Sequence, residues 1–302
     1  MKNPKPANLE RRAEMLHLIR SFFRDLSFLE VETPLRIPAP LPEAHIEVIP
    51  SDEWVLQPSP ELCMKRLLAA GHEKIFQICK CCRKAERGRR HLPEMTMLEW
   101  YASGQTYIDL MACCEDLIRR IACGLGMGDT LSYQGLTVDL SAPWPRLTVS
   151  DAFRRFGPVS MEQALAKGDF DEIMGIEIEP KLGIDRPFFL IDYPVEKASL
   201  ARLKLDHPGV AERFELYIGG LELCNGFSEL NEAAEQRRRF TAEQKLIQNL
   251  GKTVYPLPEK FIEALERLPP CAGNALGIDR LAMLFCDAAA IDEVVAFTPE
   301  DL

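Results

Sequence analysis

The 302-residue sequence has no apolar run long enough to cross a lipid bilayer, which excludes an integral membrane protein. It also lacks a hydrophobic signal segment, because Met1 to Pro4 is followed by a charged helical pattern. Basic residues are in deficit: 36 lysines and arginines stand against 46 acidic residues, and the formal net charge is −10. This balance argues against broad nonspecific binding to nucleic acid. A cytoplasmic protein is therefore expected.

The cysteines have the spacing of neither a zinc site nor a disulfide framework. Cys79 and Cys82 form a CxxC pair with no second pair at zinc-ribbon distance, and the adjacent Cys113 and Cys114 chelate metals poorly. The ten cysteines are therefore predicted to be free thiols in a reducing compartment. Without an internal repeat, low-complexity tract or linker, residues 1–302 are expected to form a single domain.

Apolar periodicity divides the chain into helices and short strands. Seven prolines between residues 34 and 60 favour ordered loops there, and residues 160–185 form a weaker helical and loop region without a chemical signal. Because hairpins are more evident than βαβ units, the pattern predicts an α+β fold around an antiparallel sheet. Helices are predicted over residues 9–27, 61–71, 107–123, 232–250, 258–268 and 277–285, and strands over residues 28–32, 75–79, 94–101 and 188–194.

A predicted hairpin over residues 75–101 carries a concentrated positive patch on this acidic chain. The period-two geometry of its returning strand puts Glu99 and Tyr101 on the face of Met95 and Met97, opposite a predicted core face. An arginine that grips a phosphate, beside a carboxylate that takes an amine, would suit an anion site here. A solvated basic loop is the alternative. The loop contains Arg83, Lys84, Arg87, Arg89, Arg90 and His91.

A second predicted hairpin turns at the glycine pair 219–220. With this turn, Tyr217 pairs with Glu222 and Glu215 pairs with Cys224, so the two glutamates become diagonal neighbours that can share a divalent cation. Acidic residues that merely face solvent are the alternative. Further along the strand, one face carries Asn225, Phe227 and Glu229.

A third segment, residues 273–281, places two glycines before an apolar helix. Gly273 and Gly277 let the backbone come close to a ligand, and Arg280 lies near the helix start, where anions are favoured. The segment has neither the ending of a phosphate-binding P-loop nor the dinucleotide fingerprint. By itself it is a weak signal for a nucleotide.

Together these segments resemble the three motifs of class II aminoacyl-tRNA synthetases, in order along the chain. The first helix and the strand ending at Pro34 are similar to motif 1, the dimer-forming element, and residues 277–281 are similar to motif 3. Arg83 with residues 91–99 resembles motif 2. Residues 59–61 (Ser59, Pro60 and Glu61) and residues 219–230 look like the lysine-specific subgroup.

Lysyl-tRNA synthetases carry an N-terminal OB-fold that reads the anticodon, whereas this chain begins almost at motif 1. The whole is therefore most similar to the truncated paralogues of that subgroup, the elongation factor P–(R)-β-lysine ligases, and Ala275 and Ser59 fit that branch. The resemblance implies one class II catalytic domain over residues 1–302, without an N-terminal OB-fold. The implied enzyme activates a lysine-type amino acid, (R)-β-lysine in this branch, as an aminoacyl-adenylate with ATP and Mg²⁺.

The implied acceptor is a lysine side chain of elongation factor P, and the implied assembly is a homodimer that binds neither membranes nor tRNA. Two alternatives stay open. One is a freestanding enzyme that transfers lysine to tRNA, which the basic loop supports. The other is a non-catalytic lysine or adenylate sensor.

The resemblance also implies a role for each matching residue. The catalytic arginines, Arg83 and Arg280, would hold the α- and γ-phosphates, and the Mg²⁺ ligands would be Glu215 and Glu222. The substrate-binding residues would be Ser59, Pro60, Glu61, Glu99, Tyr101, Asn225, Phe227, Glu229 and Ala275. The ATP-binding residues would be Arg83, Ala85, His91, Leu92, Met95, Glu222, Leu223, Gly277 and Arg280. Three of these depart from the family: Ala85 replaces Glu, Leu92 replaces Asn and Met95 replaces the Phe that stacks on adenine.

Overall fold

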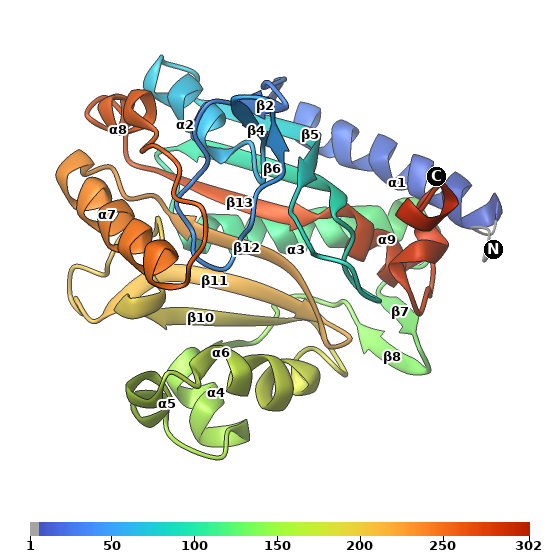
Figure 1. Cartoon of the computed structure of the whole chain (residues 1–302). Helices are drawn as coiled ribbons and strands as arrows, with labels where there is room; N and C mark the ends of the chain where they lie inside the picture. Colours follow the sequence, from blue (N-terminus) through green and yellow to red (C-terminus); the bar gives the residue numbers. More distant parts are fainter. Residues whose placement is uncertain (1–5) are drawn as a thin grey trace.

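The computed structural model describes residues 6–302, which are organised around one eight-stranded sheet (Figure 1). Its strands are β1 (Leu29–Glu30), β5 (Lys74–Cys82), β6 (Glu94–Ser103), β9 (Arg146–Thr148), β10 (Phe188–Pro194), β11 (Val210–Ile218), β12 (Leu221–Ser228) and β13 (Cys271–Gly277). They lie in the order β1-β5-β6-β13-β12-β11-β10-β9, and only the outer pairs β1–β5 and β9–β10 are parallel. The predicted α+β fold around an antiparallel sheet is confirmed.

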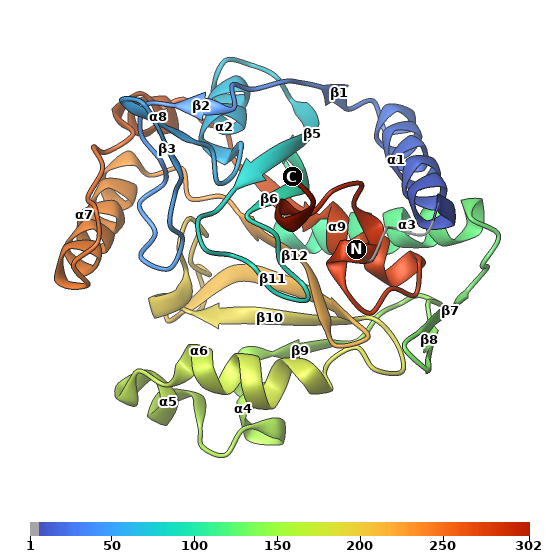
Figure 2. The same ribbon diagram turned by 45° about the vertical axis from the view of Figure 1, so that its right-hand side comes forward.

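The helices lie in three groups around this sheet (Figures 1 and 2). Their bounds are α1 (Pro6–Asp25), α2 (Glu61–Ala69), α3 (Tyr107–Gly124), α4 (Val149–Phe156), α5 (Met161–Lys167), α6 (Phe170–Ile173), α7 (Ala233–Asn249), α8 (Glu259–Leu265) and α9 (Ile278–Phe285). The largest core contains α1, α3 and α9, and a second core contains α2, α7 and α8. A third core joins α4, α5 and α6 to β10. None of the helices of residues 6–302 is long and apolar enough to span a bilayer.

The largest core decides which way the strand residues of β6 face. Phe23 of α1 stacks on Phe76 of β5 with ring centroids 4.8 Å apart, and it also contacts the fully buried Trp100 of β6. Leu98 points into the same core. Because side chains alternate along a strand, Glu99 faces the other side of the sheet. The predicted division of β6 into a core face and a site face is confirmed.

Two predictions of local structure are corrected. Residues 34–60 were expected to be loops, but they contain a three-stranded sheet of β2 (Arg36–Ile37), β3 (Pro50–Ser51) and β4 (Trp54–Leu56). Strands of two or three residues are too short for periodicity to show, and Pro50 is tolerated because it begins an edge strand. A further small hairpin, β7 (Thr130–Tyr133) with β8 (Leu136–Asp139), also escaped prediction because its strands are short.

The hairpin of β11 and β12 turns at Gly219 and Gly220 as predicted, but its register shifts at a bulge between Leu216 and Tyr217. Tyr217 pairs with Glu222 as expected, whereas Leu216, rather than Glu215, lies opposite Cys224. Glu215 instead pairs with Asn225. A bulge inserts one residue into one strand, which alternation alone cannot reveal.

Candidate active site

A cavity of about 260 Å³ lies over strands β6, β12 and β13, on the face of the sheet opposite the largest core. Most residues predicted for the site line it: Ser59, Glu61, Arg83, His91, Leu92, Met95, Glu99, Tyr101, Glu222, Leu223, Asn225, Phe227, Ala275, Gly277 and Arg280. Pro60, Ala85, Glu215 and Glu229 are not among the lining residues. Carboxylates gather at one end of this cavity and arginines at the other.

Glu99 is the central carboxylate of the acidic end. It is fully buried on β6, and each of its oxygens accepts one hydrogen bond: Ser59 Oγ donates to Oε1 at 2.6 Å and the Tyr101 hydroxyl donates to Oε2 at 2.7 Å. Burial and the nearby charge of Glu61 together raise the pKa of Glu99 to about 7, although the two hydrogen bonds oppose the shift. A cation that binds the Glu99 carboxylate therefore displaces the proton from this carboxyl group.

Lys65 is a buried cation that the sequence analysis missed. Its ammonium group contacts carboxylate oxygens of both Glu61 and Glu229, and its side chain is only 1 % exposed. Burial alone would lower the pKa of Lys65, but the two carboxylates outweigh this and raise the pKa above its usual range. Lys65 thus stays charged. A lysine four residues after Glu61, on the apolar side of a short helix, is the sequence signal that could have revealed it.

Glu229 lies behind the cavity wall, next to Lys65 and strand β13. A side chain at Gly273 of this strand would not fit, because an added Cβ would lie 2.2 Å from the ring of Tyr101 and 2.5 Å from Glu229 Oε1. Residue 275 of the same strand pairs directly with Glu99, so the small Ala275 side chain borders the acidic end. Gly273 and Ala275 therefore let the acidic end pack tightly.

The basic end of the cavity is formed by Arg83 and Arg280. Arg280 follows the start of α9, as predicted, and its Nη1 donates to the Glu222 carbonyl oxygen at 2.8 Å and to Oε2 at 3.1 Å. Its other terminal nitrogen contacts Nε2 of His91. Burial lowers the pKa of His91 and the charge of Arg280 lowers it further, so this imidazole is neutral at neutral pH. Arg83 Nη1 lies 3.7 Å from Glu86 Oε1.

Three carboxylates, those of Glu179, Glu215 and Glu222, interact electrostatically beside the basic end. Glu215 accepts hydrogen bonds from Arg213 at 2.7 Å and from the Tyr217 hydroxyl at 2.6 Å, and burial together with the charge of Glu222 raises its pKa. Glu179, from a region predicted to carry no chemical signal, joins this group. Burial raises the pKa of Glu179 to about 7, with the charges of Glu222 and Glu215 adding to the shift.

Residues 6–302 contain no group of three or more His, Cys, Asp or Glu side chains arranged to hold a metal ion by themselves. Mg²⁺ needs no such group, because it usually binds one or two carboxylates together with phosphate oxygens of a substrate. Glu222 lines the cavity, and its charge contributes to the raised pKa of Glu215. This donor set suits a magnesium–nucleotide complex.

The three departures from the family pattern lie in the loop between β5 and β6 and at the start of β6. Ala85 adopts a left-handed conformation (φ 62°), and Glu86, one position later, is the acid near Arg83. Leu92 is buried and packs against the largest core while it also borders the cavity. Met95 lines the cavity, and its flexible thioether can form an apolar platform for an aromatic base.

An antiparallel sheet that carries an acidic end and an arginine end in one cavity is the arrangement expected for class II synthetase motifs 2 and 3. Residues 1–301 match the family of class II tRNA synthetases (D, K and N), and the chain belongs to this family. Relatives narrow the class. The chain is 38% identical to the elongation factor P–(R)-β-lysine ligase of Hamiltonella defensa subsp. Acyrthosiphon pisum (strain 5AT), over 97% of this chain and 95% of the relative.

Two other relatives show the breadth of the similarity. The elongation factor P–(R)-β-lysine ligase of Vibrio cholerae serotype O1 (strain ATCC 39315 / El Tor Inaba N16961) is 38% identical, over 96% of this chain and 95% of the relative. The lysine–tRNA ligase of Thiobacillus denitrificans (strain ATCC 25259 / T1) is 36% identical, over 95% of this chain but 62% of the relative. Similarity therefore covers nearly the whole length of the two ligases and 62% of the lysine–tRNA ligase.

Proposed function

We propose that this protein is a ligase that activates a lysine-type amino acid with ATP and joins it to a lysine side chain of elongation factor P. One observation carries the proposal: a single cavity unites a carboxylate end built around Glu99 with an arginine end built around Arg280. Carboxylates suit the amines of the amino acid, and arginines suit phosphate oxygens. The relatives that match this chain along nearly their full length carry the name of that activity.

In the first half of the reaction, the cavity brings the two substrates together. Glu61 and Glu99 bind the two amines, Ser59 and Tyr101 hold the Glu99 carboxylate in place, and Asn225 lies within the same wall. The carboxylate of the amino acid then attacks the α-phosphate in line, and pyrophosphate leaves. Positioning and charge neutralisation supply the rate, so no side-chain nucleophile is required.

At the phosphate end, Arg83 holds the α-phosphate and Arg280 holds the γ-phosphate. The neutral His91 and the carbonyl oxygen of Glu222 orient the Arg280 guanidinium. Glu215 and Glu222 would hold Mg²⁺, which supplies neutralisation of phosphate charge when bound. Met95 and Phe227 border the adenine or the stem of the amino acid, and Gly277 leaves room for the nucleotide near the backbone.

We propose (R)-β-lysine as the amino acid. Ala275 pairs with Glu99 across the strands, and Ser59 bonds to the same carboxylate, so both branch-specific residues border the group that takes an amine. A β-amino acid carries that amine one carbon further from its carboxylate than an α-amino acid does. The position of Glu99 relative to Ala275 would distinguish the amine of a β-amino acid from that of an α-amino acid.

The contacts that the arginines of the basic loop make within the protein favour a protein acceptor over tRNA. Arg87 forms ion pairs with Asp292 at 3.0 Å and with Glu300 at 2.9 Å, so its charge is neutralised by the C-terminal segment. Arg89 and Arg90 donate hydrogen bonds to backbone carbonyl groups. The charge of Arg87 is therefore already balanced by carboxylates, and these contacts restrict Arg89 and Arg90 from turning toward phosphates of RNA.

The direct test incubates the protein with ATP, elongation factor P and either α-lysine or (R)-β-lysine. Mass spectrometry of the acceptor is expected to show the addition of one lysyl residue, with (R)-β-lysine the better donor. An acceptor whose modified lysine is replaced by arginine serves as the control. Stable aminoacylation of purified tRNA in place of the protein would contradict the proposal. So would the absence of lysine-dependent ATP–pyrophosphate exchange.

The raised pKa of Glu99 predicts a pH-dependent affinity for the amino acid. Glu99 titrates at about 7, and the ammonium binds only its carboxylate form. The dissociation constant is therefore expected to rise about tenfold per pH unit as the pH falls from about 7 to about 5, because binding then displaces one proton. Isothermal titration of ATP-free protein with the preferred lysine isomer at several pH values measures this, and the Glu99→Gln variant should lose the dependence. Equal affinities at pH 5 and pH 8 would contradict the assignment.

The raised pKa of Glu99 also makes the free energy of unfolding of the ligand-free protein depend on pH. Because the folded state binds this proton more tightly than the unfolded chain does, the contribution of Glu99 is present in full below its unfolded pKa of 4.5. It is lost as the pH rises through about 7. Thermal unfolding of wild type and Glu99→Gln across this range separates the contribution of Glu99 from those of other groups.

We also propose that the protein is a cytoplasmic homodimer with one catalytic domain. Exposed apolar side chains that follow α1, namely Leu26, Leu29 and Leu35, support a dimer surface there. The ten free thiols support a reducing compartment. The single large sheet shared by residues 29–277 supports one catalytic domain; residues 1–5 of the predicted domain lie outside the described residues.

A further inference from the structure

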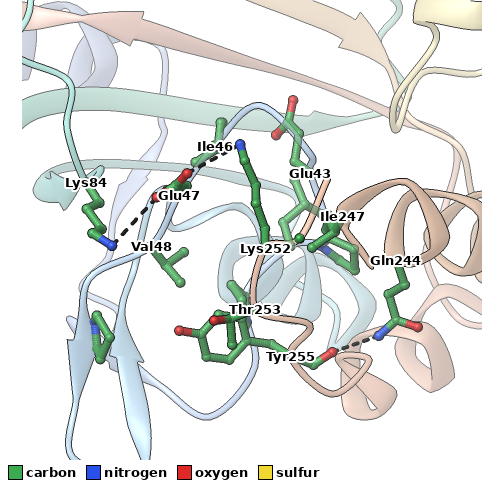
Figure 3. A pocket seen from close by; sticks show the side chains of 15 residues that line it. Glu43, Ile46, Glu47, Val48, Lys84, Gln244, Ile247, Lys252, Thr253 and Tyr255 are labelled. Carbon is green, nitrogen blue, oxygen red and sulfur yellow. Dashed lines mark hydrogen bonds and ion pairs between the residues drawn. The ribbon is translucent and has the colours of Figure 1, made fainter. Parts of the chain in front are cut away.

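A second cavity of about 300 Å³ lies next to the active site (Figure 3). It is bordered by the chain between β2 and β3, the loop after β5, and the end of α7 with the residues that follow. Its apolar lining includes Leu41, Pro42, Ile46, Val48, Ile247 and Tyr255. These apolar side chains suit an aliphatic chain, and the polar part of the lining is formed by Glu43, Glu47, Lys84, Gln244, Lys252 and Thr253.

The second cavity and the active site share part of their walls. Leu41, Glu43 and Ile46 line both cavities, so the same short segment forms the boundary between them. Glu43 also lies within electrostatic range of Arg83 and Glu61. These two residues mark the α-phosphate and the amine of the proposed adenylate. The bond between acyl group and phosphate has to lie between them, in the cavity that Glu43 also lines.

Glu43 differs from Glu47, the other carboxylate of the second cavity, because its side chain forms no hydrogen bond or ion pair with another of residues 6–302. Lys84 and Lys252 approach Glu47 from two sides, at 3.7 Å and 3.4 Å, and Gln244 donates to the Tyr255 carbonyl oxygen at 2.7 Å (Figure 3). No dashed line reaches Glu43 in the same view. Burial raises its pKa, whereas the charge of Arg83 opposes the shift. An unpaired, partly buried carboxylate of this kind is a suitable proton acceptor.

We propose that the second cavity admits the aminoalkyl side chain of the acceptor lysine, and that Glu43 accepts the proton which its ammonium group must lose. This inference rests on the proposed function. The aliphatic part of the acceptor side chain packs on the apolar lining around Ile46 and Val48, and its ammonium group reaches Glu43 at the boundary. Charge complementarity supports this occupant, because Glu43 is the carboxylate of the cavity that is not already paired with a lysine.

The chemical step balances with these groups alone. Glu43 takes one proton from the acceptor ammonium, and the freed lone pair of the nitrogen attacks the acyl carbon of the adenylate. The new carbon–nitrogen bond forms as the carbon–oxygen bond to phosphate breaks, and its electron pair leaves on AMP. The second proton of the nitrogen leaves to the departing phosphate oxygen, and Glu43 returns its proton to solvent.

The Glu43→Gln variant tests this role because it keeps the shape of the side chain and removes its basicity. Transfer to elongation factor P is expected to fall by about 100-fold or more, the usual range for loss of a general base. Lysine-dependent ATP–pyrophosphate exchange should stay within about threefold of wild type, since adenylate formation needs no base. Trapping of the adenylate by hydroxylamine should also persist, because hydroxylamine is already neutral near pH 7 and is small enough to need no side-chain channel.

A matched variant and a steric variant complete the experiment. Glu53→Gln removes an exposed carboxylate from the turn between β3 and β4 and should retain transfer. Thr253→Trp narrows the second cavity from its far side and should reduce transfer but not exchange, which also covers the case of a misfolded Glu43 variant. Normal transfer in either Glu43→Gln or Thr253→Trp would overturn the inference. Equal losses of transfer and exchange would overturn it as well. Absence of exchange in the wild type would instead reject the proposed function itself.

Discussion

Replacing Lys65 with methionine is expected to reduce lysine-dependent ATP–pyrophosphate exchange by at least about 100-fold, because it removes the buried cation that positions the acidic end. The Lys65 ammonium contacts both Glu61 and Glu229. Without it, Glu61 and Glu229 would repel each other or take up protons, and Glu61 would no longer present a carboxylate to the substrate amine. The charge count of the site would change too. Once Glu61, Glu99 and Glu229 are all ionised, Lys65 balances one of the three carboxylates and leaves two negative charges for the two ammonium groups of a lysine.

The same substitution is expected to lower the free energy of unfolding by about 3–5 kcal/mol, the usual cost of leaving a buried charge without its partner. Denaturant unfolding measures this loss, and pyrophosphate exchange measured below the unfolding transition keeps the two effects apart. Arg66→Met is the matched control, because Arg66 follows Lys65 on the same helix and is exposed. It should change stability by no more than about 0.5 kcal/mol. A fully active Lys65→Met variant would show that the acidic end does not need this cation.

Replacing Arg280 with methionine is expected to reduce ATP–pyrophosphate exchange by about 100- to 1,000-fold, the usual effect of removing one preorganised charge from a phosphate site. Arg280 is held toward the cavity by Glu222 and His91, so its guanidinium needs little rearrangement when phosphate arrives. Methionine keeps much of the aliphatic stem but removes every donor. The loss should appear as a changed dependence of the exchange rate on ATP concentration, because other residues bind the amines of the amino acid.

Calorimetric titration with the amino acid alone provides the internal control for Arg280→Met, since its affinity should stay within about twofold of wild type when a distant group is changed. Arg238→Met is the matched surface variant. Among residues 6–302, Arg238 pairs with Glu235 of the same helix alone, and its side chain is 70% exposed. Exchange should be unaffected by that change. An Arg280→Met variant with normal ATP dependence would contradict the assignment of Arg280 to the phosphates.

Residues that share one strand or one helix were placed correctly by their spacing. Alternation along β6 predicts that Glu99 and Tyr101 share a face, and the structure joins them by a hydrogen bond. The glycine pair after Tyr217 predicts the turn between β11 and β12. The position of Arg280 after Gly277 predicts its place at the start of α9. In each case the periods of strands and helices, or the backbone freedom of glycine, act within a few residues.

Features that depend on contacts between distant segments could not be predicted in this way. The bulge that moves Glu215 opposite Asn225 shifts the register by one residue, and alternation carries no signal of it. Glu179 was overlooked because its own segment has no motif, yet folding brings it into electrostatic range of Glu222. The short strands of residues 34–60 are stabilised by pairing with each other rather than by their own composition.

The sequence by itself determined the α+β class, the order of the motifs and the faces of the individual strands, because these follow from local periodicity and chain geometry. Only the tertiary structure decided that Lys65 neutralises Glu61 and Glu229, since α2 and the end of β12 meet through packing. Only the tertiary structure left Glu43 unpaired at the boundary of two cavities. The physical reason is the same in both cases. Burial and electrostatic partners depend on which segments the folded core brings together, and no local pattern encodes them.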